Sequence, residues 1–180
     1  MQGQEVIPLG RYDEISYTIG GHFLVRSGGD RDPDTWEWAN AHWAIVDSQG
    51  RVVVAPGRYD EITAASDSRF IVRIGGNFNP TTWQMENARW AVLDAQGNEV
   101  IPFGRYDRIH LLGHFSFLYH DAGMVYDFKV TAGDRIGVRC LGGHEVIPMG
   151  RYDWVQSIHN GLAIVVRDGR VGVVNLEAMD

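Results

Sequence analysis

The chain has 180 residues, of which 44% are hydrophobic and 22% charged, values typical of a folded globular protein rather than a disordered or fibrous one. Lys and Arg number 16 against 23 Asp and Glu, and the net charge of −7 argues against nucleic acid as a ligand because it repels phosphates. The single cysteine excludes an intramolecular disulfide, so we expect a reducing compartment and a fold held together by packing.

The N-terminal residues show no sign of a targeting signal. Residues 1–8 hold neither a basic region nor the apolar stretch that forms a signal peptide. No apolar run in the chain approaches the roughly 20 residues that a membrane-spanning helix needs. We therefore expect a cytoplasmic protein that does not bind a membrane.

One tetrapeptide, Gly-Arg-Tyr-Asp, occurs four times at a nearly constant spacing. The copies are residues 10–13, 57–60, 104–107 and 150–153, separated by 47, 47 and 46 residues. Self-similarity at a fixed period is typical of repeat proteins, in which each unit buries its apolar face on its neighbours. We expect one repeat domain over residues 1–180, with units at roughly 2–48, 49–95, 96–141 and 142–180.

Three short apolar runs recur around each tetrapeptide and predict strands. They lie at 5–8, 23–25 and 43–47, at 52–55, 70–72 and 90–94, at 99–102, 117–119 and 136–140, and at 145–148, 163–166 and 171–175. The runs are rich in β-branched and aromatic residues and are bounded by Gly, Asp, Asn or Ser. Asp168-Gly169 between two of them predicts a tight hairpin. The predicted fold class is all-β, with four tandem antiparallel meanders.

The fourth unit resembles the bacterial WG repeat. Its Glu145-Val146-Ile147-Pro148, Tyr152-Asp153 and Val171-Gly172 correspond to the family's Val-Ile-Pro, Tyr-Asp and Trp-Gly segments, and the resemblance extends over essentially the whole chain. Trp43 and Trp90 keep the Trp but are followed by Ala, whereas Ile136 and Val171 precede the Gly without a Trp. The resemblance implies a β-repeat architecture and a binding role, and it implies no catalytic residues.

The four units can form a closed, β-propeller-like ring or an open β-solenoid. The chain begins with the strand that elsewhere follows the turn Asp-Ser-Gln-Gly and ends with the strand that elsewhere precedes it. The two end segments could therefore pair and remove exposed edges, which favours the ring. The open solenoid stays an alternative because WG arrays can be long, although neither end resembles a polar capping unit.

We interpret the repeated tetrapeptide as framework. The Gly should form a turn, the Tyr should pack over a strand, and the Asp should accept turn amides or pair with the Arg. A ring would also bring four arginines to one axis, where they could hold an anion, but functional residues usually break a repeat whereas framework residues follow it. The motif residues are Arg11, Tyr12, Asp13, Arg58, Tyr59, Asp60, Arg105, Tyr106, Asp107, Arg151, Tyr152 and Asp153.

Three units contain an insertion between the second and third runs, at 28–40, 75–87 and 122–132. Each insertion alternates apolar and polar residues, which predicts a hairpin arm with one apolar face. We expect the arms to form a partner-binding surface, since interface hot spots favour aromatic anchors. Its residues would be Trp36, Trp38, Trp83, Met85, Tyr126 and Phe128. The alternative is that the arms pack on one another or supply a further strand.

Other chemistry-bearing residues are better explained by structure. Asp30, Asp32 and Asp34 alternate as in a calcium loop, but Thr35 and Ala41 stand where that loop needs Gly and an acid. His110, His114 and His120 cluster without neighbouring Cys or a second copy. Cys140 occupies the strand-end position of Asp47, Asp94 and Asn175 and is expected to be inert. We expect no metal and no cofactor.

The leading functional hypothesis is a non-catalytic protein-interaction module that binds a basic protein partner. A sharper version, by analogy only, is neutralisation of a basic toxin, as small acidic immunity proteins do. The alternative is a glycan or cell-wall carbohydrate binder that uses exposed Trp rings. A third possibility is an enzyme, although the sequence contains none of the usual nucleophile, phosphate-binding or dinucleotide motifs. The oligomeric state is not predicted.

Overall fold

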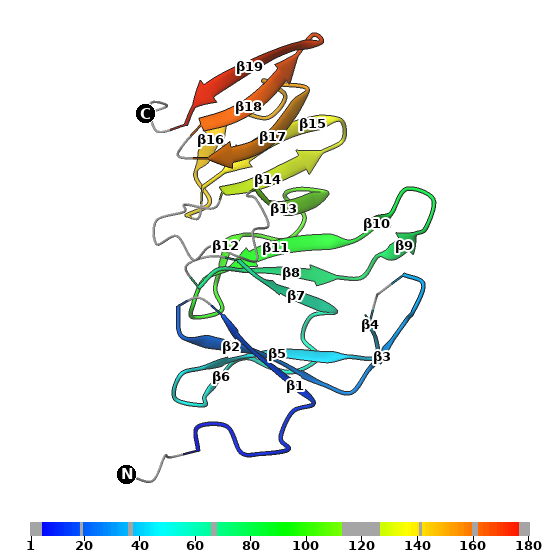
Figure 1. Cartoon of the computed structure of the whole chain (residues 1–180), viewed down its shortest axis with the longest axis vertical. Helices are drawn as coiled ribbons and strands as arrows, with labels where there is room; N and C mark the ends of the chain where they lie inside the picture. Colours follow the sequence, from blue (N-terminus) through cyan, green and yellow to red (C-terminus); the bar gives the residue numbers. More distant parts are fainter. Residues whose placement is uncertain are drawn as a thin grey trace. The chain divides into compact units, whose positions relative to one another are not determined.

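The computed structural model describes residues 5–18, 20–35, 38–65, 68–112, 127–140, 142–159 and 162–176. The regular structure of these residues is entirely β, as predicted, and they include no helix long and apolar enough to cross a membrane. Contacts divide the chain into an N-terminal unit, Met1–Glu99, and a C-terminal unit, Val100–Asp180. Each unit contains two of the four main sheets (Figure 1).

The N-terminal unit holds the sheets of the first two repeats. The first sheet has the order β1-β2-β5-β6, from β1 (Glu14–Thr18), β2 (His22–Ser27), β5 (His42–Asp47) and β6 (Val52–Val54). The second has the order β12-β11-β8-β7, from β7 (Glu61–Ala64), β8 (Phe70–Ile74), β11 (Arg89–Leu93) and β12 (Glu99–Ile101), the strand at the junction of the two units.

The C-terminal unit holds the sheets of the third and fourth repeats. The third sheet is β13-β14-β15-β16, from β13 (Arg108–Leu112), β14 (Asp127–Ala132), β15 (Arg135–Arg139) and β16 (Glu145–Ile147). The fourth has three strands in the described residues, β17 (Trp154–His159), β18 (Leu162–Arg167) and β19 (Arg170–Asn175). All four sheets are antiparallel meanders, as the sequence predicts.

A short strand precedes the second, third and fourth tetrapeptides and closes the sheet that comes before it. β6 pairs with β5, with Ile45 opposite Val54, and β16 pairs with β15, with Val138 opposite Ile147. The first three sheets therefore run across the repeat boundaries expected from the sequence. The tetrapeptide then leads the chain from one sheet to the next.

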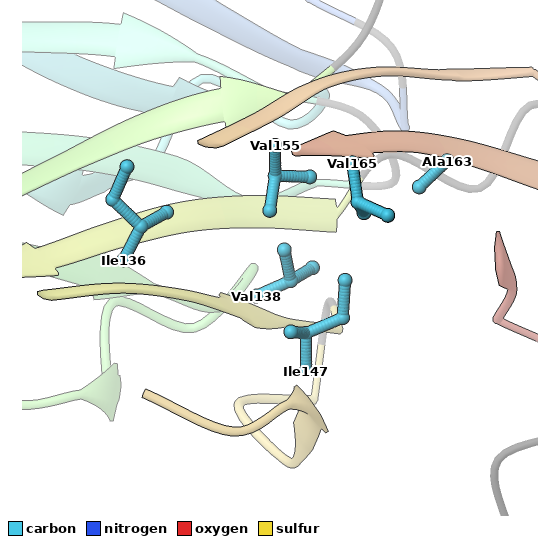
Figure 2. Close-up of a cluster of buried hydrophobic side chains, with 6 residues drawn as sticks. All are labelled: Ile136, Val138, Ile147, Val155, Ala163 and Val165. Carbon is cyan, nitrogen blue, oxygen red and sulfur yellow. The ribbon is translucent and has the colours of Figure 1, made fainter. Parts of the chain in front are cut away.

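The third and fourth sheets bury their apolar faces against each other. In the C-terminal unit, Ile136, Val138 and Ile147 of the third repeat form one cluster with Val155, Ala163 and Val165 of the fourth (Figure 2). We call the face that packs on the following repeat the downstream face, and the face that packs on the preceding repeat the upstream face. The core of this unit thus lies between its two repeats, as expected for a repeat protein.

A turn glycine brings neighbouring repeats into close backbone contact. Gly143, in the turn between β15 and β16, has φ of +82°, and a Cβ there would lie 2.7 Å from the carbonyl oxygen of Val100. The equivalent turn glycines, Gly50 and Gly97, face the carbonyl oxygens of Val6 and Val53 in the same way. Only glycine combines this conformation with so close an approach.

An aspartate closes the turn after the third strand in the first two repeats. The Oδ1 of Asp47 accepts hydrogen bonds of 2.9 Å from the amides of Gln49 and Arg51, and Oδ1 of Asp94 accepts from Gln96 and Asn98 at 2.9 and 2.8 Å. Partial burial works to raise the pKa of both carboxyls, but these hydrogen bonds outweigh it and lower the pKa of each. Cys140 holds the equivalent position in the third repeat as a half-buried free thiol.

Candidate functional site

Two hairpin arms extend from the N-terminal unit, each between the second and third strand of its sheet (Figure 1). In the first arm, residues 28–41, β3 (Asp30–Arg31) pairs with β4 (Trp38–Ala39). In the second arm, residues 75–88, β9 (Asn77–Asn79) pairs with β10 (Gln84–Glu86), with Met85 opposite Phe78. The prediction of hairpin arms is correct for these two repeats.

The tetrapeptide aspartate fixes the point where each arm leaves its sheet. Oδ2 of Asp60 accepts a hydrogen bond of 2.6 Å from the amide of Gly75, the first residue of the second arm. Asp13 accepts from Gly28 of the first arm at the same distance. In the third and fourth repeats, Asp107 and Asp153 accept from Gly133 and Asp168 of short turns at 2.7 Å.

The remaining tetrapeptide residues also lie as framework. The motif glycines have positive φ, for example +74° at Gly57, and Tyr59 and Tyr106 are buried, with 3% and 7% of their surface exposed. Each motif arginine is exposed and lies over the ring of its own Tyr, at 5.3 to 5.7 Å from Cζ to the ring centroid. The arginines thus cover the tyrosines from the solvent side.

A buried arginine supports the base of each arm. Arg26 and Arg73 are only 9% and 6% exposed. The Nε of Arg73 donates to Glu61 at 2.8 Å and its Nη1 donates to the carbonyl of Gly75 at 2.8 Å. Arg26 repeats both contacts, with Glu14 and Gly28. A glutamate stands twelve residues before each arginine, and this spacing was the signal in the sequence that could have indicated the ion pair.

Aromatic rings join the first arm to its sheet. The ring of Trp38 lies 3.8 Å from the Cζ of Arg26, a cation–π contact, and meets Trp43 of β5 edge-on at 6.5 Å between centroids. Trp38 is half-buried. It therefore anchors the arm to the protein and leaves only part of its surface for a partner.

The second arm presents an exposed tryptophan. Trp83 lies at the tip with 67% of its surface exposed and packs edge-on against Phe78 at 5.7 Å. Its φ of +53° is rare for a bulky residue, and such a strained conformation often marks a functional position. Asn79 supports the tip, since its Oδ1 accepts the amide of Thr81 at 2.9 Å and its Nδ2 donates to Glu86 at 2.7 Å.

Met85, opposite Phe78, extends the apolar patch that Trp83 and Phe78 form on the second arm. It is half-buried and packs over the backbone of Gly76, where a Cβ would come within 2.9 Å of its Cγ. Phe78, also half-buried, was not among the expected binding residues. Its place between Asn77 and Asn79, opposite an apolar residue of the facing strand, was the signal that could have identified it.

The acidic turn of the first arm is a hydrogen-bonded turn. Oδ1 of Asp32 accepts the amides of Thr35 and Asp34, both at 2.9 Å, and these bonds lower the pKa of Asp32. Within the described residues, no group of three His, Cys, Asp or Glu side chains is placed to hold a metal ion. Of the clustered histidines, His114 and His120 lie outside the described residues.

The third repeat differs from the prediction. The second strand of its sheet is β14, and Phe128 in β14 is fully buried. Residues 117–119, which the sequence predicts as this strand, lie outside the described residues. The expected arm at 122–132 is therefore wrong in its C-terminal half, where a tight turn at Gly133-Asp134 leads directly into β15. Phe128 contributes to the core and not to a surface. Trp36 and Tyr126 lie outside the described residues.

A separate hollow of about 530 Å³ opens among the turns of the N-terminal unit. Its lining includes His22, Asp47, Arg51, Val53 and Gln96. The polar groups there already bond to the protein: Arg51 pairs with Asp47 at 2.7 Å, and the two ring nitrogens of His22 face the carbonyls of Gly20 and Ala95 at 3.2 and 3.1 Å. The hollow offers less to a ligand than the arms do.

Comparison with known families identifies the repeat. A family model described as the WG containing repeat matches residues 43–78, 90–116 and 142–170, which together make up just over half of the chain. The match confirms the resemblance seen in the sequence. No curated protein and no solved structure matches the chain significantly.

Proposed function

Because this chain belongs to the family of proteins with the WG containing repeat, we propose that it is a non-catalytic protein-interaction module whose binding surface lies on the two arms. The observation that carries the proposal is the exposed ring of Trp83, held on Phe78 at the tip of a hairpin outside the main sheets. Rigid aromatic anchors of this kind dominate the binding energy of protein interfaces.

The charge of the chain favours a basic partner. The net charge is −7, and the first arm carries Asp30, Asp32 and Asp34, all exposed, against a single arginine, Arg31. Apolar anchors beside acidic groups combine short-range affinity with electrostatic steering. Neutralisation of a basic toxin or enzyme, as in small acidic immunity proteins, is the more specific form of this proposal and rests on analogy.

The proposal that the protein is not an enzyme is supported by the structural role of three aspartates whose pKa values are shifted. Asp32, Asp47 and Asp94 have lowered pKa values because each accepts backbone amides of its own turn. A catalytic acid or base is more often shifted toward neutral pH by its environment. These carboxyls instead stabilise turns.

The larger architecture is part of the proposal. The ring that the sequence favours would need residues 5–7 to pair with β19 of the same chain, and the open solenoid would not. The two arms belong to neighbouring repeats of one unit and follow the same strand of the repeat. They can therefore contribute to one surface under either arrangement.

Affinity capture with matched variants tests the function. Immobilised wild-type protein, Trp83→Ala and, as a control at an exposed turn away from the arms, His144→Ala are incubated with one bacterial lysate, and retained proteins are quantified. The proposal expects a protein retained by wild type and His144→Ala that Trp83→Ala retains poorly. With that protein purified, calorimetry should show Kd raised about 30-fold, since a hot-spot aromatic contributes about 2 kcal/mol.

The outcome against the proposal is equally clear. If Trp83→Ala and Phe78→Ala both retain the same proteins as the wild type, the arms are not the binding surface. Melting temperatures of the variants must match the wild type, which the 67% exposure of Trp83 leads us to expect.

Carbohydrate binding is the second candidate, favoured by the same exposed Trp83, because an exposed Trp face suits a sugar ring. Intrinsic fluorescence of wild type and Trp83→Phe, titrated with soluble glycans and peptidoglycan fragments, separates the two candidates. A saturable change that is lost in Trp83→Phe would establish glycan binding. No change with any glycan would leave the protein-binding proposal as the explanation of the exposed ring.

A further inference from the structure

The downstream face of the fourth repeat carries exposed apolar residues. Val171 and Val173 of β19 are 75% and 64% exposed, and Ile164, opposite Val173 in β18, is 37% exposed. By the pairing register, Ile136 and Val138 of the third repeat occupy the positions of Val171 and Val173. Those two residues are only 9% and 0% exposed, because the fourth repeat packs on them.

Within the described part of the chain, the same sheet has no counterpart of the strand that closes the other three. In the described residues β19 is the edge of a three-stranded sheet, whereas β6, β12 and β16 complete four-stranded sheets at the corresponding edge. An edge strand exposes unpaired backbone amides and carbonyls, which readily accept a further strand. Both the face and the edge of the fourth sheet are therefore open.

The N-terminal segment has the sequence of the missing strand. Residues 5–7 read Glu-Val-Ile and are followed by Pro8, as in Glu99–Ile101 before Pro102 and Glu145–Ile147 before Pro148. Those two segments form β12 and β16, but residues 5–7 are described and do not form a strand. This segment precedes the first tetrapeptide just as β16 precedes the fourth.

The upstream face of the first repeat is incompletely covered. Ile15 is 48% exposed, while its equivalents Ile62, Ile109 and Val155 are 3%, 1% and 0% exposed. Val25, Ala44 and Val46 form the buried centre of this face, covered in part by Ile7 and Tyr12. In the cluster between the third and fourth repeats, the matching face of the fourth repeat also packs on Ile136 and Val138 of the third.

We propose that these two ends dock onto each other between two copies of the chain, head to tail. Residues 5–7 of one copy add to β19 of the other as its fourth strand, and the face around Ile15 covers Val171 and Val173. The docked interface repeats the one already present between the third and fourth repeats, in which β16 pairs with β15 and Val155 packs against Ile136 and Val138. The surface is distinct from the arms of the proposed function.

Such a contact joins two different surfaces, so it continues from copy to copy. A heterologous interface produces rings when the rotation closes and open filaments when it does not. The expected solution behaviour is therefore a distribution of oligomers that grows with protein concentration, not a single dimer. Strand addition and face packing act together, so blocking either one should weaken association.

Two charge-introducing variants block one end each. Val173→Lys places a cation on the downstream face and Ile15→Lys on the upstream face, and both sites are exposed enough for the fold to be kept, which circular dichroism checks. His144→Lys adds the same group at an exposed turn of the C-terminal unit as a control. Sedimentation velocity should show oligomers for the wild type and His144→Lys, and monomers for each blocked variant.

Mixing the two blocked variants gives the decisive result. Val173→Lys keeps an open upstream face and Ile15→Lys keeps an open downstream face, so an equimolar mixture should form a one-to-one dimer and nothing larger. If Ile15→Lys alone still associates, the contact is between like faces and the proposal is wrong. A wild type that stays monomeric at every concentration also overturns it, and points to closure within one chain or to another protein as the cover. Trp83→Ala should associate like the wild type, which separates this test from that of the arms.

Discussion

The carboxylate of Asp60 lies 2.6 Å from the amide nitrogen of Gly75, fifteen residues further along the chain, and accepts its hydrogen. This bond recurs in all four repeats, whether the following segment is an arm or a tight turn. Asp60→Ala should destabilise the protein by about 1 to 2 kcal/mol, because the amide loses its acceptor. Urea unfolding measures the loss, and Asp60→Asn, which keeps one acceptor oxygen, should lose less.

Replacing Tyr59 by Ala should cost about 3 kcal/mol, because the ring is 3% exposed and its removal leaves a cavity. Arg58→Ala is the matched control at the neighbouring, exposed position and should cost less than about 0.5 kcal/mol. Both are measured by chemical denaturation. Equal and small losses would show that the tyrosine is not structural.

Gly143→Ala tests the close approach between repeats. A Cβ at Gly143 would lie 2.7 Å from the Val100 carbonyl, whereas one at Gly104, which has a similar φ of +76°, would meet nothing within 4 Å. Gly104→Ala should therefore cost only the backbone strain, about 1 kcal/mol, and Gly143→Ala should cost at least about 1 kcal/mol more. Thermal or urea unfolding of the two variants measures the difference. Equal losses of stability would mean that the turn at Gly143 moves away from Val100 without cost.

Arg73 and Glu61 should contribute unequally. The guanidinium of Arg73 is buried, donates to Glu61 and to the Gly75 carbonyl and lies 6.0 Å from the Trp90 ring centroid, whereas the Glu61 side chain is 38% exposed. We expect Arg73→Ala to cost about 2 kcal/mol and Glu61→Gln less than about 1 kcal/mol. A double-mutant cycle by urea unfolding gives the coupling. Equal single effects would contradict the role of the other two contacts.

The turn aspartates make stability depend on pH. The pKa values of Asp47 and Asp94 are lowered in the folded protein, so their contribution is present above the unfolded value and is lost as the pH falls through the folded value. Stability should therefore fall on acidification below about pH 4, where unfolded aspartates take up protons. The measurement is the urea concentration at the midpoint of unfolding, determined at a series of pH values. In Asp47→Asn and Asp94→Asn this midpoint should fall less steeply on acidification than in the wild type. If the double variant loses stability on acidification as steeply as the wild type, other carboxyls cause the loss.

The sheets could be predicted from the sequence because each strand is a short apolar run between turn residues. The tetrapeptide then sets the repeat period. The third repeat could not be placed by pattern alone, since residues 117–119 are a short apolar run and residues 127–132 alternate, and either pattern is typical of a strand. The turn Gly133-Asp134 immediately before β15, equivalent to Asp168-Gly169, was the feature that favours β14.

The candidate site was only partly predictable. The hairpin arms follow from local alternation, but alternation does not show which aromatic ring returns to the sheet. Trp38 does so because a buried arginine, Arg26, offers its guanidinium at 3.8 Å, and that arginine looks like any surface residue in the sequence. Trp83 stays outward because its partner, Phe78, belongs to the same arm.

The position after the second strand works as an insertion point. The segment there is a two-residue turn at 133–134 in the third repeat and an arm at 75–88 in the second. The first residue of each segment donates its amide to the tetrapeptide aspartate of its own repeat, Asp60 or Asp107. The flanking strands therefore keep their pairing while the length and content of the segment change. Foreign hairpins could be grafted at this point in any of the four repeats, which would make the protein a scaffold for displaying several engineered loops.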